Sequence, residues 1–300
     1  MTWPAGFGTQ LRLDGNARDA VTVDPTEPPI VVDTARTSVG IGFNRTIEDI
    51  AADGDHPGLQ RLVGCRGGGY LRAALDEHLP DERAAGTPLS LLLDDISGTS
   101  LIAGFGWSRW TKDWISPPDR VQRPSMEGVC IGFAPGSSAL VEREVNMQIH
   151  RTQPVGPLMH PDDPHGWHPL PSLPDVSMRR ARRIDVWRDG DTVRIDTGFQ
   201  DSSGDPDHGR IAVHEYVLRA AADASTLTLQ SLEIDPRVLP FMECPSAKAN
   251  AMGMIRTPLR EMRAAVLGRL AKTNGCTHLN DALRALAEVP VLLAHLDAHT

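Results

Sequence analysis

Between residues 184 and 218, three short segments separated by turn residues have the sequence character of β-strands, and this pattern limits the fold more than any other feature of the chain. The first segment of the pattern ends at Asp189–Gly190, a dipeptide typical of two-residue hairpin turns. Alternation resumes from Val193 to Phe199, and a third segment follows over 211–218. Successive strands joined by short turns predict an antiparallel sheet.

Strict alternation along IAVHEYVL predicts that His214 and Tyr216 share one face of the third strand, while Glu215 lies on the other face with Val213 and Val217. A fourth strand begins near residue 227. Its apolar spacing slips by one residue, which predicts a β-bulge around Gln230–Ser231.

The last fifty-odd residues change to a helical period of apolar side chains. A short helix is expected over Ser246–Met254. A second helix begins with Thr257 as its cap and ends at Asn274–Gly275, and a third begins with Thr277 as its cap and ends before Pro290.

The region before residue 154 carries weaker signals. Residues 1–30 show no periodicity and predict an irregular N-terminal arm, followed by a β-rich half over 31–153. Within that half, the Leu/Ile-rich run Pro88–Trp110 is interrupted at Asp94 and Asp95, which indicates two strands joined by a polar turn with the aspartates as turn formers.

Residues 154–178 are too rich in proline for a helix or a central strand, so we expect a connection there and a domain boundary. Residues 179–300 then form the antiparallel sheet and the C-terminal helices. The predicted fold class is α+β, with antiparallel sheets in both halves and a C-terminal group of packed helices.

Composition excludes several classes of function. The 300 residues carry a formal charge of −9, which disfavours nucleic acid and anionic membranes as partners. The apolar stretches are far shorter than a membrane span, the N-terminus lacks a secretory pattern, and the four cysteines form no close pairs. We therefore expect a cytoplasmic protein with reduced thiols. The glycine runs match no nucleotide-binding fingerprint, so no cofactor is expected.

Four blocks in the C-terminal half carry a family resemblance: RRARRIDVWRDGDTVRIDTGFQDS, VHEYVLRA, DPRVLPFMECPSA and GCTHLNDALRALAEVP. They are similar to the bacterial proteins of domain-of-unknown-function family 2889. Two earlier blocks, LLLDDISGTSLIAGF and GVCIGFAPGSS, resemble the N-terminal part of actinobacterial members, so the resemblance extends from about Arg36 to Pro290. It implies a bacterial, cytoplasmic protein found alongside catabolic enzymes for aromatic or fatty-acid-like compounds. The family has no defining reaction that fixes an activity.

The block CTHLND places several polar groups at the start of a predicted helix. A helix N-terminus attracts anions and keeps a histidine neutral. His278 is therefore a candidate general acid or base, and Thr277 to Asn280 a candidate oxyanion or carboxylate site. The alternative is plain capping, with no chemistry.

Further roles follow from neighbouring segments. Arg180, Arg182 and Arg183 are candidates for a substrate carboxylate clamp, or else for a salt-bridged strand entry. Glu215 and Tyr216 are candidates for a second proton carrier, although a charged residue in a sheet is more often structural.

A metal site is the third option. It requires Cys244, Cys276 and His278 to converge, with His214 or Cys130 as a fourth ligand, and the chain lacks the two close pairs typical of structural zinc.

The leading expectation is a cofactor-independent lyase or isomerase that acts on a small aromatic or lipid-like organic acid by general acid–base catalysis. The alternatives are a non-catalytic small-molecule-binding or accessory protein of a catabolic pathway, and a zinc-dependent hydrolase or lyase. The oligomeric state does not follow from the sequence, and a homodimer is one expectation.

Overall fold

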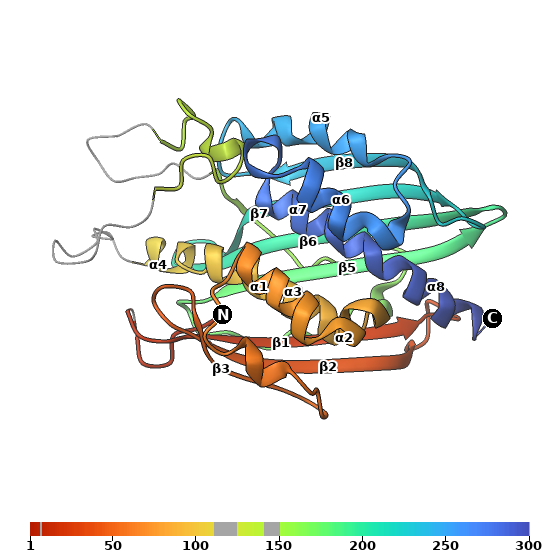
Figure 1. Ribbon diagram of the computed structural model, residues 1–300, viewed down its shortest axis with the longest axis horizontal. Helices are drawn as coiled ribbons and strands as arrows, with labels where there is room; N and C mark the ends of the chain where they lie inside the picture. Colours follow the sequence, from red (N-terminus) through yellow and green to blue (C-terminus); the bar gives the residue numbers. More distant parts are fainter. Residues whose placement is uncertain (7, 111–124, 141–150, 300) are drawn as a thin grey trace.

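The computed structural model describes residues 1–6, 8–110, 125–140 and 151–299, which form an α+β fold with two antiparallel sheets (Figure 1). The first sheet has the order β1-β2-β3. The second has the order β4-β7-β6-β5, with β8 also paired to β7. The strands are β1 (Leu11–Val21), β2 (Ile30–Ile41), β3 (Ile47–Ala52), β4 (Gln153–Pro154), β5 (Met178–Asp189), β6 (Thr192–Asp205), β7 (Gly209–Asp223) and β8 (Leu229–Val238).

Helices of both halves lie in front of the sheets in Figure 1. They are α1 (Gly69–His78), α2 (Pro80–Ala85), α3 (Pro88–Ile102), α4 (Phe105–Ser108), α5 (Ala247–Ala251), α6 (Met262–Arg269), α7 (Thr277–Arg284) and α8 (Val289–Asp297). The α3 helix packs on β1 and β2, while α8 contacts both β1 and β5. Among the described helices, none has the length and apolar character needed to cross a membrane.

The five-stranded sheet confirms the predicted meander. Gly190 has a φ of 58° in the tight turn between β5 and β6, a conformation that favours glycine. The bulge near Gln230–Ser231 is also confirmed, because Ala221 pairs with Ser231 while Ala222 pairs with Leu229. A second bulge was not predicted: His214 pairs with Asp201 and Ala212 with Ser202, so the register skips Val213. Strict alternation therefore fails at that point of β7 but holds from His214 onward.

The N-terminal half departs from the predictions in two places. Residues 11–21 form strand β1 rather than part of an irregular arm. The run that starts at Pro88 is the helix α3 rather than two strands: Thr87 caps it, Pro88 occupies its first turn, and Leu89, Leu93 and Ile96 are buried at helical spacing. Asp94 and Asp95 lie within this helix and are therefore not turn formers.

The Thr87 cap provides a direct test of the helix that begins at Pro88. The Thr87 hydroxyl oxygen accepts a hydrogen bond from the backbone N–H of Ser90 at 3.2 Å. Thr87→Ala should lower the free energy of unfolding by about 1 kcal/mol, since it leaves that N–H without its cap. Thr99→Ala, in the interior of the same helix, should be neutral or stabilising because alanine has the higher helix propensity. Chemical denaturation of both variants measures the difference; equal losses would contradict the capping role.

The C-terminal helices differ from the predictions at their ends. The α7 helix begins at Thr277 with Cys276 as its N-cap, and no side chain caps it. It gives way at Arg284 to a 3-10 turn instead of continuing to Pro290, which lies in the first turn of α8. Proline is tolerated there because the first helical N–H groups have no partner within the helix.

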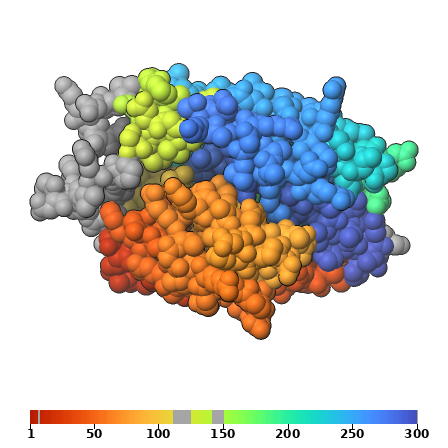
Figure 2. All heavy atoms as spheres, in the orientation of Figure 1, coloured from red at the N-terminus to blue at the C-terminus, as the bar shows by residue number. Residues whose placement is uncertain are grey.

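Buried ion pairs join the two halves beneath the surface seen in Figure 2, where the N-terminal and C-terminal parts meet. Asp94 on α3 accepts hydrogen bonds from Nη2 and Nε of Arg284 on α7 at 2.5 and 3.0 Å. Arg83 on α2 also donates to Asp94, and Asp95 accepts from Arg182 on β5. Burial by itself raises the pKa of Asp94, but Arg284 and the nearby arginines more than reverse this and hold the pKa below its usual range.

The proline-rich residues 154–178 contain little regular structure, as predicted, beyond the end of β4 and a 3-10 turn at Pro164–Gly166. They pass along the five-stranded sheet, where Gln200 donates to the carbonyl of Gly156 and Arg183 donates to that of Leu158. Their role as a domain boundary stays a prediction.

Candidate functional site

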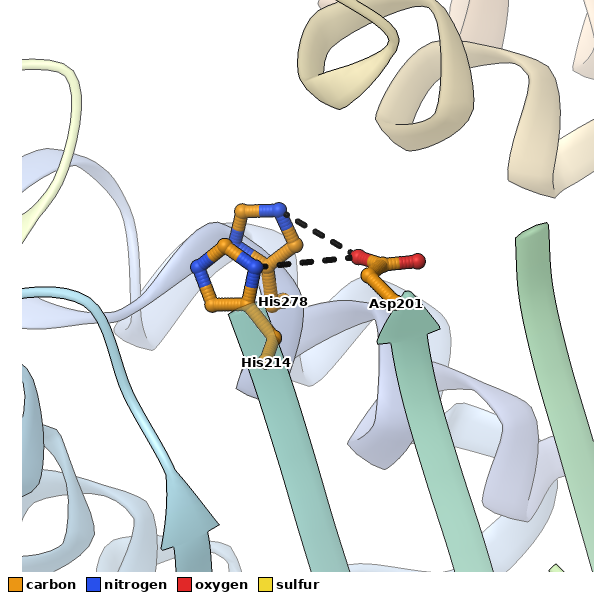
Figure 3. Close-up of side chains that lie close together, drawn as sticks. All are labelled: Asp201, His214 and His278. Atoms are coloured by element: carbon orange, nitrogen blue, oxygen red, sulfur yellow. Dashed lines mark ion pairs between the residues drawn. The ribbon is translucent and has the colours of Figure 1, made fainter. Parts of the chain in front are cut away.

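A row of three side chains crosses the five-stranded sheet on the face covered by the helices. Arg180 on β5 pairs in register with Asp201 on β6, which pairs with His214 on β7. His278, from the first turn of α7, lies over the His214 end of this row (Figure 3). Directly paired residues of neighbouring strands share a face, so the register and the bulge beside Val213 bring these groups together.

Both imidazoles face one oxygen of Asp201 (Figure 3). Asp201 Oδ2 lies 3.5 Å from His278 Nε2 and 3.9 Å from His214 Nδ1. The two rings are stacked, with centroids 3.4 Å apart and planes 16° apart. His278 Nε2 is buried and makes no hydrogen bond with any described residue, while His278 Nδ1 lies 3.2 Å from the hydroxyl oxygen of Thr277.

Arg180 fixes the position of the Asp201 carboxylate. Its Nε and Nη2 donate to Oδ1 and Oδ2 of Asp201, both at 2.8 Å. Its Nη1 donates to Asp95 at 3.1 Å and to Asp281 at 2.8 Å. Bidentate pairing of this kind restricts both the position and the rotation of a carboxylate. Arg180 is thus committed to aspartates and is not free to clamp a substrate.

The electrostatics keep His278 neutral. Burial, reinforced by the Arg180 guanidinium, lowers the pKa of His278 well below its usual value. Because carboxylate oxygens only accept hydrogen bonds, the neutral tautomer with its proton on Nε2 suits the Asp201 side, and Nδ1 can then accept from the Thr277 hydroxyl. The stacked rings of His214 and His278 cannot both carry a positive charge at this separation. The two imidazoles together can therefore take up at most one additional proton.

This lowered pKa predicts a pH dependence of stability. Below about pH 6.5 the unfolded chain protonates His278 and the folded chain does not, so folded-state stability decreases as the pH falls. Between pH 7 and pH 5 the wild type should lose about 2 kcal/mol more than His278→Gln, which lacks the titrating group. Urea denaturation at both pH values tests this. Parallel losses in the two proteins would show that His278 titrates normally when folded.

The N-terminus of α7 does not provide the predicted anion site. The thiols of Cys130 and Cys276 lie near the backbone N–H groups of Thr277, His278 and Leu279, which partly offset the rise in thiol pKa that burial causes. The Asn280 side chain donates to the carbonyl of Leu270 at 2.8 Å. The two thiols therefore lie beside the N–H groups to which an oxyanion would have to bind.

The other predicted site residues divide between the two faces of the sheet. Arg182 lies near the cluster and donates to Asp95 and to the carbonyl of Asp281. Arg183 pairs with Asp196 and Asp185, outside the cluster. Glu215 accepts from Gln200 at 2.9 Å and lies on the opposite face from His278. The structure therefore does not bring Arg183 or Glu215 to His278.

Tyr216 shares the face of His214, as predicted, but its hydroxyl donates to the thiol of Cys276 at 3.4 Å. Burial, together with Cys276, raises the pKa of Tyr216 well above its usual value. A phenol so reluctant to ionise is a poor proton carrier at neutral pH.

The proposed cysteine ligands do not join His278. In the described part of the chain, His278 forms a potential ligand group with Asp201 and His214, and no such group includes a cysteine. Burial raises the pKa of Cys276 to about 11 and that of Cys244 further, which disfavours the thiolate form that binds metals.

Asp201, His214 and His278 lie close enough to form a metal site, but the orientation of the two rings does not suit one. A metal ion bonds an imidazole nitrogen in the plane of the ring, and one ion cannot lie in both of two stacked planes 3.4 Å apart. Arg180 also places a positive charge directly against the Asp201 carboxylate. The arrangement of these residues therefore does not suit a divalent cation.

Sequence reasoning missed Asp201, the carboxylate at the centre of the site. Asp201 stands in the segment QDSSGDPD, which resembles a turn, although it lies within β6. Its position opposite His214 depends on the register of β6 and β7 and on the bulge beside Val213, which the sequence does not indicate.

Comparison with known proteins finds a similarity to one family in the C-terminal half. Residues 178–292 match the family DUF2889, described as a protein of unknown function. The resemblance expected from the four C-terminal blocks is confirmed over this range. The two earlier blocks lie outside it, so the DUF2889 match covers less than half of the chain. No curated protein and no solved structure gave a match. The DUF2889 region contains Arg180, Asp201, His214 and His278, the four residues that form the His278 cluster.

Proposed function

We propose that the protein is a cofactor-independent lyase or isomerase that acts on a small organic acid by general acid–base catalysis. The observation that carries the proposal is the neutral, buried His278 between the Asp201 carboxylate and the Thr277 hydroxyl. A base in contact with a hydroxyl and oriented by a third group is the usual arrangement for moving a proton.

The proton path follows from the two nitrogens of His278. Thr277 is half-buried and is the more exposed end of the arrangement. The Thr277 hydroxyl gives its proton to His278 Nδ1 as it accepts one from the substrate, and the imidazolium that forms is stabilised by Asp201. Return of the proton to another atom of the substrate completes an isomerisation or an elimination. The protein is then unchanged, and no electron acceptor is consumed.

His214 supports the same chemistry from its position on the His278 ring. Its face-to-face contact at 3.4 Å makes protonation of one imidazole oppose protonation of the other. This repulsion favours release of the proton from His278 once it has been accepted. The path through Thr277 and His278 therefore does not use Glu215 or Tyr216, the residues that were expected to supply a second proton carrier.

Mass-spectrometric turnover of a pool of aromatic and aliphatic carboxylic acids tests the proposal. The wild type should convert at least one acid to an isomer or to a pair of fragments, and His278→Gln should lose this conversion. The matched control is His299→Gln, at an exposed histidine, which should convert at the wild-type rate. Treatment with a chelator should leave turnover intact. Loss of turnover on chelation with recovery on adding Zn²⁺ would replace the proposal by a metal-dependent reaction, and retention of an unchanged acid would favour the binding-protein alternative.

A further inference from the structure

A cavity of about 330 Å³ lies on the face of the five-stranded sheet that is turned away from His278. Its floor is formed by β5, β6 and β7, and the proline-rich segment 155–170 forms its other wall. The lining residues are Val155, Gly156, Pro157, Trp167, Leu170, Arg179, Ala181, Gln200 and Arg210. Arg179 is next to Arg180 on β5, so the strand's alternation places the cavity and the His278 cluster on opposite faces.

Two guanidinium groups in this cavity have no acidic partner among the residues that the structure describes. Arg210 donates to the carbonyl and hydroxyl oxygens of Ser202 and to the hydroxyl of Ser177, while Arg179 donates to the carbonyl of Pro171. Within the described part of the chain, no carboxylate oxygen lies within 4.0 Å of either guanidinium. Burial and the neighbouring Arg179 lower the pKa of Arg210 to about 10. Positive charges that are partly removed from water and close to each other usually have an anionic partner.

The neighbouring arginines of the same strand show how unusual this is. Arg180 pairs with Asp201, Arg182 with Asp95 and Arg183 with Asp196. These three arginines are neutralised by aspartates. Arg179 and Arg210, at the cavity, have no such neutralising partner among the described residues.

The walls of the cavity are apolar on either side of the arginines. These surfaces come from Trp167, Leu170, Val155, Pro157 and Ala181, and none of the described residues that line the cavity is Asp or Glu. This combination suits a ligand with one anionic end and an apolar body.

The cavity continues into a larger hollow of about 680 Å³ that shares Leu170, Arg179 and Arg210. Three aspartates line this outer hollow. Asp205 is engaged by Arg109 and His208, and Asp175 and Asp207 are exposed at its edge. The outer hollow thus provides an entrance, and its carboxylates leave the two arginines at the inner end unpaired.

We propose that this cavity binds a small organic carboxylate with an aromatic or branched aliphatic body, its carboxylate held between Arg179 and Arg210. The site is separate from the His278 cluster and does not rest on the acid–base activity. It assigns a ligand-binding role to the proline-rich segment.

Calorimetric titration with benzoate and with isovalerate tests the proposal, with benzamide as the neutral analogue and inorganic phosphate as an anion without an apolar body. The wild type should bind a carboxylate. Arg210→Gln and Arg179→Gln should each weaken this binding at least tenfold, in keeping with the loss of a charge-assisted hydrogen bond. Two matched controls should bind as the wild type does: Arg194→Gln, at an exposed arginine on β6, and His278→Gln, which separates this site from the proposed catalytic one.

A second measurement guards against misfolding of the variants. Removal of one of two like charges should leave the ligand-free melting temperature unchanged or higher, whereas loss of a structural arginine would lower it. Carboxylate binding that is unchanged in both arginine variants, equal binding of benzamide, or no binding of either carboxylate would each overturn the proposal. Binding of phosphate alone would also overturn it, because the apolar walls would then have no role.

Discussion

Asp94→Asn should lower the free energy of unfolding by about 3–5 kcal/mol, the largest loss of stability expected for any single substitution considered for this protein. The Asp94 carboxylate is buried and accepts hydrogen bonds from Arg284 and Arg83. An amide in its place leaves the Arg284 guanidinium, of which only 1% is exposed, without its counter-charge. Breaking one partner of a buried pair costs more than the pair itself contributes, because the remaining charge is not solvated.

Asp76→Asn is the matched control for this prediction. Asp76 pairs with the same Arg83, but its side chain is 61% exposed. Its loss should therefore cost less than about 1 kcal/mol. In addition, the double variant Asp94→Asn/Arg284→Met should lose less stability than the sum of the two single variants, since the unpaired charge is removed. Equal losses for Asp76→Asn and Asp94→Asn in urea denaturation would contradict the buried connection between the two halves.

Asp201→Asn should reduce kcat by about 10²–10⁴-fold, the range expected when a general base loses its orientation. Asp201 is a positioning residue: it faces His278 Nε2 and stabilises the imidazolium, and the proton itself moves at Nδ1. The KM should change little, because Asp201 does not contact the substrate. The pH profile of kcat should shift as well, since the imidazolium loses the adjacent negative charge.

The fold should tolerate Asp201→Asn because Arg180 keeps its hydrogen bonds to Asp95 and Asp281. Asp196→Asn is the control, on the same strand and on the opposite face, where it breaks the pair with Arg183. It should lower stability without changing kcat. A loss of turnover that is equal in the two variants would show that Asp201 acts through stability alone.

The strands of the C-terminal half could be predicted from the Asp189–Gly190 turn and from the alternation over Val193–Phe199, although β6 and β7 are buried on both faces over most of their length. The α3 helix could not be predicted by the same reasoning. Its leucine run has the composition of a strand, and Asp94 and Asp95 are residues typical of turns. They can be accommodated within a helix because arginines from other elements neutralise them. Arg284 is 190 residues away from Asp94. No local pattern indicates that a helix will bury a carboxylate beside an arginine at that separation.

The candidate site could also be predicted only in part. His278 and Arg180 were recognisable from their segments, and alternation placed His214 on the face opposite Glu215. Asp201 was not recognisable, because its importance depends on the register of three strands and on a helix from the end of the chain. The position of the Cys130 thiol beside the start of α7 likewise depends on the fold around residue 130.

The protonation state of His278 is the most direct test of its proposed role as a general base. Nitrogen NMR of the ¹⁵N-histidine-labelled protein measures it. His278→Gln identifies the His278 signals by their loss. We expect a neutral His278 ring from pH 8 to pH 5, with the proton on Nε2 facing Asp201 and an unprotonated Nδ1 facing Thr277. A ring that becomes charged near pH 6.5, or nitrogen shifts of a metal-bound imidazole, would contradict it.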